Sequence, residues 1–169
     1  MTDEIDIAIV AEIWAQAPGA GQIILRAIEA CGSRLGRTGE EAEISIVLCD
    51  DAEIRRLNRQ WRGKDAATNV LSFPTPPGPG SNRHLGDIVI AFETVEREAS
   101  EEAKRFDHHL SHMAVHGYLH LTGFDHENEN DAEEMEQLER EILASIGIAD
   151  PYHAEMSNSP EQDAGRQTQ

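Results

Sequence analysis

The sequence predicts an α+β fold, a small mixed sheet of about four strands packed with helices. Two patterns along the 169 residues indicate it. In the first half of the chain, apolar side chains alternate with polar or small ones, which is typical of half-buried strands. In the second half they recur at helical spacing, which predicts amphipathic helices. Because strands mostly precede helices, we expect one sheet with helices packed against it.

The chain length corresponds to about one domain, and we expect that domain to span residues 1–152. No Leu, Ile, Val or Phe follows Ile148. A segment without such residues cannot bury a core, so we expect the polar tail 153–169 to be disordered.

Alternating or continuous apolar segments predict the strands, at 5–9, 44–48, 70–73 and 85–92. The third strand stops at Pro74. The stretch from Pro74 to Gly80 is too rich in proline and glycine for regular structure, so we expect a surface loop there.

Helical periodicity predicts the remaining elements. One helix runs from Ile23 until Gly32, and three more are expected at 93–104, 108–121 and 130–146. Gly147 should stop the last of these helices. The acidic run from Glu127 to Glu141 is interpreted as a solvated helix face.

A short helix is expected after Asp50, because Asp50 and Glu53 resemble a capping box. We expect this helix to turn Ile54, Leu57 and Trp61 inward.

Composition excludes several classes of protein. The formal net charge of −18 and the isoelectric point near 4.7 exclude a generally basic nucleic-acid-coating protein, although a local basic groove remains compatible. The acidic N-terminus does not resemble a signal peptide, and no apolar run is long enough for a membrane span. Cys31 and Cys49 fit buried thiols in a reducing cytoplasm better than a single disulfide. We therefore expect a cytoplasmic protein.

The strongest chemical signal is a group of histidines. His116 and His120 are four residues apart on an expected helix, and His126 follows a turn at Gly123. Residues at this spacing can converge on one ion, and three imidazoles leave one tetrahedral position open, as in catalytic zinc sites. We therefore predict that His116, His120 and His126 bind one Zn²⁺.

Other polar residues near these motifs are interpreted as solvent-facing, supporting or structural. His108, His109 and His112 are expected to face solvent or to orient the ligands, and His112 lies one turn from His116. Asp87, at the start of a strand, either supports the site or is structural.

Basic residues concentrate before the third strand. Five of the 14 lysines and arginines fall within ten positions, namely Arg55, Arg56, Arg59, Arg62 and Lys64. Arg62 is expected beyond the short helix, beside Gly63, where an extended backbone would aim it at a cleft. A guanidinium can hold a phosphate through two parallel donors, so Arg62 is a candidate catalytic residue alongside His116.

Three segments carry a family resemblance. Residues 57–74 include Leu-Asn-Arg-Gln-Trp-Arg-Gly-Lys-Asp and Thr-Asn-Val-Leu-Ser-Phe-Pro, and residues 85–90 read Leu-Gly-Asp-Ile-Val-Ile. Residues 116–126 read His-Gly-Tyr-Leu-His-Leu-Thr-Gly-Phe-Asp-His. From about residue 43 to 152 the chain resembles the YbeY family of bacterial metal-dependent endoribonucleases, with Phe124 replacing the Tyr of the last motif.

The resemblance implies a single-strand-preferring endoribonuclease. It would act in ribosomal RNA maturation, including the 3′ end of the small-subunit (16S) rRNA, and in ribosome quality control. Its zinc ligands would be His116, His120 and His126, and Arg62 would match an arginine important for function. The implied partners are ribosomal RNA and the small subunit or ribosome, with no DNA and no membrane.

Two alternatives remain. The histidine spacing also matches zinc metallopeptidases of the metzincin type, but Gly117 stands where those enzymes need a glutamate as general base. The other alternative is a noncatalytic ribosome-assembly factor with a structural metal. The general base is unassigned, and either water or the ribose 2′-hydroxyl could be the nucleophile.

Overall fold

The computed structural model describes residues 4–36, 42–76 and 84–152. The expected tail 153–169, and most of the expected loop between Pro74 and Gly80, lie outside these ranges.

The expected mixed sheet of four strands is confirmed. Its strands are β1 (Glu4–Ile9), β2 (Glu43–Cys49), β3 (Val70–Pro74) and β4 (His84–Ala91). They lie in the order β1-β2-β4-β3, with β1, β2 and β4 parallel and β3 antiparallel to β4. In the described part of the chain β3 is therefore an edge strand, and the outer side of its backbone is open to other groups.

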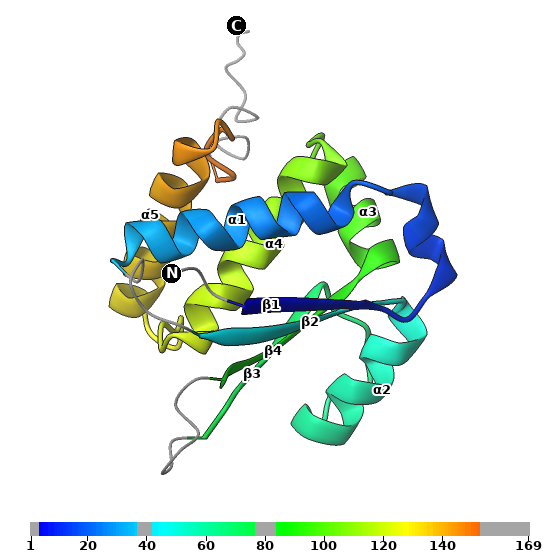
Figure 1. The fold of residues 1–169 in the computed structure, drawn as a ribbon. Coiled ribbons are helices and arrows are strands. Elements are labelled where there is room, and N and C mark those ends of the chain that lie inside the picture. The colour runs from blue at the N-terminus through cyan, green and yellow to red at the C-terminus, as the bar shows by residue number, and fades with distance from the viewer. Residues whose placement is uncertain (1–3, 37–41, 77–83, 153–169) are drawn as a thin grey trace, which may run out of the picture.

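Helices cover both faces of this sheet (Figure 1). On one side lie the four helices α1 (Ala20–Arg34), α3 (Phe92–Glu101), α4 (Phe106–Leu121) and α5 (Glu129–Ser145). The other side carries α2 (Asp51–Arg62). Side chains alternate between the two faces of a strand, so Ile88 and Ile90 enter the larger core under α1 and α4, whereas Val89 packs on the α2 side.

The start of α2 follows the sequence prediction, but its end does not. The Asp50 side chain accepts a hydrogen bond from the Glu53 N–H at 3.0 Å, which confirms the cap. Ile54 is buried as expected, whereas Trp61 is 64% exposed, so its inward orientation was wrongly predicted. Trp61 lies in the last turn of α2, and its ring is 6.5 Å from the ring of Phe73 on the edge strand, in an edge-to-face arrangement.

The end of α2 also corrects the expected position of Arg62. Arg62 is the last residue of the helix rather than part of an extended segment beyond it. Gly63 then adopts a left-handed conformation with φ 72° and ends the helix, as glycine commonly does.

The N-terminal region contains an element that periodicity did not indicate, the 3₁₀ helix η1 (Glu12–Gln16). It buries Trp14, whose indole N–H donates to the Cys49 carbonyl at 2.8 Å. Cys31 and Cys49 are both free and buried, as predicted. Burial, followed by nearby carboxylates, raises the pKa of Cys49 to about 12. Within the described ranges, no helix is long and apolar enough to cross a membrane.

Candidate metal centre

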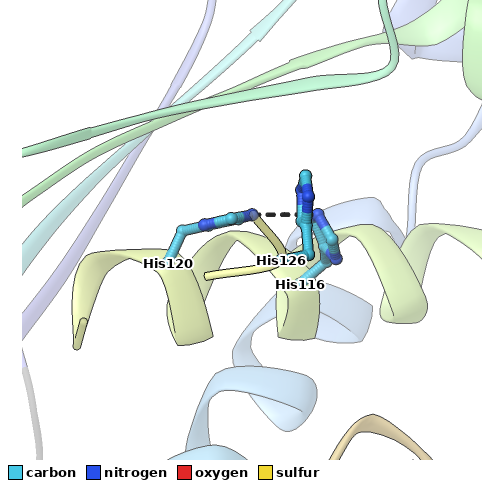
Figure 2. A group of neighbouring side chains, drawn as sticks. All are labelled: His116, His120 and His126. Atoms are coloured by element: carbon cyan, nitrogen blue, oxygen red, sulfur yellow. Dashed lines mark hydrogen bonds between the residues drawn. The ribbon is translucent and has the colours of Figure 1, made fainter. Parts of the chain in front are cut away.

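The three predicted histidines meet at the C-terminal end of α4. His116 and His120 lie on successive turns of the helix, which ends at Leu121. Gly123, with φ 105°, then reverses the chain, a conformation that glycine adopts at little cost. The reversal brings His126 back over the helix, and the three rings face one another (Figure 2).

Their geometry fits a metal ion. One potential ligand atom from each of the three rings lies within 4.8 Å of the other two. His116 Nε2 and His120 Nε2 are 3.2 Å apart. Two nitrogen ligands of a tetrahedral zinc ion are separated by about 3.3 Å, given zinc–nitrogen bonds of about 2.0–2.1 Å. The His triad could therefore hold a metal ion with little movement of His116 or His120.

The electrostatic surroundings keep His120 neutral at physiological pH. Burial, then the neighbouring His116 and His126, lower its pKa to about 4. Because only a neutral imidazole can bind a metal, a lowered pKa favours the ligating form.

A residue that the sequence analysis missed supports His116 from behind. Glu139 of α5 was expected on a solvated acidic face, and this was wrong, because its exposed fraction is 0%. One carboxylate oxygen accepts a hydrogen bond from His116 Nδ1 at 2.6 Å. The proton on Nδ1 leaves the lone pair of Nε2 directed at His120. A carboxylate behind a ligating histidine commonly orients metal sites in this way.

Two further side chains complete the surroundings of Glu139. Its other carboxylate oxygen accepts a hydrogen bond from His112 Nε2 at 3.0 Å and another from the Tyr152 hydroxyl. Burial alone would raise the pKa of Glu139, but the hydrogen bonds from His112 and His116 outweigh it and hold the pKa below its usual range. Burial and the Glu139 charge raise the pKa of the Tyr152 hydroxyl. Glu139 is thus a buried carboxylate with three donors.

The structure separates the roles of the other α4 histidines. His112 is buried and holds Glu139 rather than facing solvent. His109 is also buried, and its Nε2 pairs at 2.9 Å with Glu98, which in turn accepts a hydrogen bond from the Asn69 amide. His108 is half-buried, and the three-histidine group does not include it.

The close packing around Gly117 leaves no room for a carboxylate side chain at the position after His116. This position faces the sheet, and a Cβ there would lie 2.9 Å from Ile88 Cγ2 and 3.3 Å from Ser72 Oγ. The Ser72 hydroxyl donates to the Gly117 carbonyl at 3.3 Å. A glutamate at this site would point into the packed core instead of toward the histidines, so the arrangement lacks the general base of a metzincin peptidase.

A pocket of about 550 Å³ opens beside the histidines. All three histidines line it, together with much of β3 and with Arg62. The Arg62 guanidinium donates to the Ser72 carbonyl at 2.7 Å, on the edge strand. The structure thus brings Arg62 to the same pocket as the predicted metal ligands, although 54 residues separate Arg62 from His116 in the sequence.

Other polar residues considered from the sequence lie away from this pocket. Arg55 pairs with Asp65 at 2.8 Å, and Arg56 pairs with Glu53 at 2.7 Å. Lys64 and Asp87 are not part of the pocket lining. Asp87 sits 3.6 Å from His84 on β4, which is consistent with a structural position.

Fold and site together define a small α+β protein with three histidines at the end of a helix that could hold a metal ion. The sequence model of the family described as Endoribonuclease YbeY matches residues 15–147. Endoribonuclease YbeY of Bradyrhizobium diazoefficiens is 54% identical over 153 residues, covering 87% of this chain and 84% of that protein. The protein of the same name from Nitrobacter winogradskyi is also 54% identical, covering 87% and 80%.

A solved structure supports the fold. The solution structure of TM1509 from Thermotoga maritima matches with a TM-score of 0.58 and 25% identity, covering 95% of this chain and 96% of that one. The chain belongs to the YbeY endoribonuclease family, which confirms the resemblance found in the three sequence motifs.

Proposed function

We propose that this chain is a single-strand-specific, zinc-dependent endoribonuclease that processes ribosomal RNA in the cytoplasm, including the 3′ end of the small-subunit RNA, and acts in late ribosome quality control. The observation that carries the proposal is the shared pocket, which three convergent imidazoles and the Arg62 side chain line together. A nitrogen donor set with an open position suits zinc, and a guanidinium suits a phosphodiester.

His116, His120 and His126 would hold the metal. When bound, zinc supplies a Lewis acid and lowers the pKa of a coordinated water toward about 7. Glu139 keeps the proton of His116 on Nδ1, which fixes the ring and directs Nε2 at the centre. Gly123 places His126 by reversing the chain.

Arg62 would bind the phosphate. Its contact with the Ser72 carbonyl uses one nitrogen of the guanidinium. In the described part of the chain no other acceptor is bonded to this guanidinium, so its remaining donors can contact nonbridging oxygens of the scissile phosphate. Donors that are held in place before the reaction stabilise charge as it develops in the transition state, and the contact with β3 provides such restraint.

The identity of the nucleophile determines the products. Attack by the neighbouring ribose 2′-hydroxyl leaves a 2′,3′-cyclic phosphate, whereas attack by water can leave a 5′-phosphate on the downstream fragment. Two carboxylates, Asp125 and Glu127, line the pocket and are candidates for the general base that Gly117 cannot supply. End-group analysis of the cleaved RNA distinguishes the two routes.

The net charge of the protein affects how an RNA substrate reaches the pocket. A charge of −18 opposes nonspecific RNA binding, and the affinity for free RNA should fall further with salt. We therefore propose that the small ribosomal subunit or the ribosome presents the RNA to the pocket.

The test measures metal content and cleavage of single-stranded and duplex RNA on one preparation. The proposal expects about one zinc per chain and internal cleavage of the single strand. A noncatalytic assembly factor would show the metal but no turnover on any RNA. Peptide cleavage that disappears in the His116→Ala variant would instead support a peptidase.

A further inference from the structure

Trp61 has the largest exposed fraction among the large apolar side chains in the described part of the chain, at 64%. The second tryptophan, Trp14, is 2% exposed in the core. A single exposed apolar residue is common on protein surfaces, so exposure alone indicates nothing. The neighbours of Trp61 give it a specific chemical setting.

Trp61 belongs to a small cluster with Phe73 and Arg62. The Trp61 and Phe73 rings are 6.5 Å apart at 65°, an edge-to-face arrangement. The Arg62 guanidinium carbon lies 5.6 Å from the centre of the same Phe73 ring. Phe73 is half-buried and packs on the apolar cluster between α2 and the sheet. Phe73 thus anchors both the exposed indole and the guanidinium.

The guanidinium of this cluster forms no ion pair in the described part of the chain. Two neighbouring arginines, Arg55 and Arg56, are each paired with a carboxylate. Arg62 instead donates to the Ser72 carbonyl, whereas the ion pairs found among residues 4–36, 42–76 and 84–152 do not include it. On an acidic protein, such a guanidinium beside an exposed indole favours an anionic ligand with an aromatic part.

This cluster is continuous with the metal pocket. Arg62 and Val70, Leu71, Ser72 and Pro74 of the edge strand line the pocket, while Arg62 also contacts Phe73. The surface therefore extends from the histidines, across the edge of β3, to Trp61. Aromatic side chains that stack unpaired bases, next to cations that hold the backbone, are the usual means of binding single-stranded nucleic acid.

We propose that the exposed face of Trp61 is a stacking platform for an unpaired base of single-stranded RNA. The adjacent phosphate would contact Arg62, and the strand would continue over β3 to the metal centre. This inference rests on the proposed endoribonuclease function and specifies how the substrate is held. Bases of a duplex are already stacked on each other, so the platform would favour a single strand.

Tryptophan fluorescence provides a direct test. The full-length protein is titrated at low salt with a single-stranded RNA carrying 2′-O-methyl and phosphorothioate groups, about ten nucleotides long, and a gel checks that it stays intact. Stacking should quench the emission of Trp61, whereas duplex RNA should not. In the Trp61→Phe variant only buried Trp14 emits, and its fluorescence should stay constant while binding persists.

Affinity measured by anisotropy of a labelled RNA separates stacking from general apolar contact. Trp61→Ala and Trp61→Leu should bind about 5- to 150-fold more weakly, since base stacking on an aromatic side chain has that magnitude. Trp61→Phe should remain within a few-fold of the parent. The control Leu25→Ala removes another exposed apolar side chain, on α1, and should not change the affinity. Melting temperatures should be unchanged in all these variants.

The outcomes distinguish the platform from the proposed function. If the parent cleaves single-stranded RNA but Trp61→Ala and Trp61→Leu bind as tightly as the parent, the platform is wrong and the function stands. If duplex RNA quenches the Trp61 fluorescence as strongly as single-stranded RNA does, the proposed stacking of an unpaired base on Trp61 is also wrong. If the parent neither binds nor cleaves single-stranded RNA, both proposals fail.

Discussion

The carboxylate of Glu139 on α5 lies 2.6 Å from His116 Nδ1 on α4, although the two residues are 23 positions apart. This contact joins the last long helix to the three histidines that could hold a metal ion. His112 and Tyr152 also donate hydrogen bonds to the buried Glu139 carboxylate, which therefore links both side chains to His116.

Replacing Glu139 should weaken metal binding. Glu139→Gln retains the volume but loses the charge and one acceptor oxygen, so His116 is less firmly oriented. Loss of such a supporting carboxylate typically reduces metal affinity by about 10- to 100-fold. Competition with a chromophoric chelator measures the change. Glu133→Gln, an exposed substitution on the same helix, is the control and should leave the affinity unaltered.

The stability of the metal-free protein should depend on the charge of Glu139. Its lowered pKa means that the folded state favours the carboxylate. The resulting stabilisation is complete above the ordinary glutamate pKa of about 4.3 and is lost as the pH falls further. Urea unfolding should therefore show Glu139→Gln less stable than the parent at pH near 7, with a smaller difference at pH near 3. A difference that grows with acidification would contradict the assigned direction.

Gly117→Ala should destabilise the fold. The new methyl would meet Ile88 Cγ2 at 2.9 Å, and overpacking of this kind costs about 1–3 kcal/mol. Gly21→Ala in α1 is a matched control, because its methyl would meet only Ile7 Cδ1 at 3.9 Å. There the better helix propensity of alanine should stabilise by up to about 1 kcal/mol. Thermal or urea unfolding of both variants provides the comparison, and equal effects would show that α4 can move away from the sheet.

Arg62→Ala should lose activity while keeping its metal. Arg62 is exposed at the end of α2, so its removal should leave the melting temperature nearly unchanged. Loss of a preorganised donor to the transition state typically lowers kcat by about 100- to 1,000-fold. Lys64→Ala, two residues away and outside the pocket lining, should retain activity and show a weaker salt dependence. Parent-level cleavage by Arg62→Ala would remove Arg62 from the mechanism.

Most of the fold was predictable because the spacing of apolar residues along the sequence indicates which side chains are buried. The alternation at 44–48 and the apolar run near Ile88 correspond to β2 and β4, and the four-residue histidine spacing correctly placed His116 and His120 on one helix. The turn at Gly123 also followed from residue type, because its positive φ is one that glycine readily adopts. These features depend on local sequence.

Features that depend on distant contacts were missed. Glu139 was assigned to an acidic surface because composition dominated the interpretation of the run that contains it. Its spacing carried the opposite signal, since it is four residues after Met135 and three before Ile142, both buried. Trp61 was predicted inward from its apolar character, but its turn of α2 reaches the edge strand, where little covers it.

The most direct test of the central claim is a zinc titration of the stripped protein, followed by the rate of single-stranded RNA cleavage. The account predicts a rate that rises with added zinc and saturates near one equivalent per chain. In His126→Ala the rise should be absent or need a large excess, because two imidazoles hold zinc weakly. Undiminished cleavage by the stripped protein, or full recovery of His126→Ala at one equivalent, would contradict the assignment of His116, His120 and His126 as the metal centre of the enzyme.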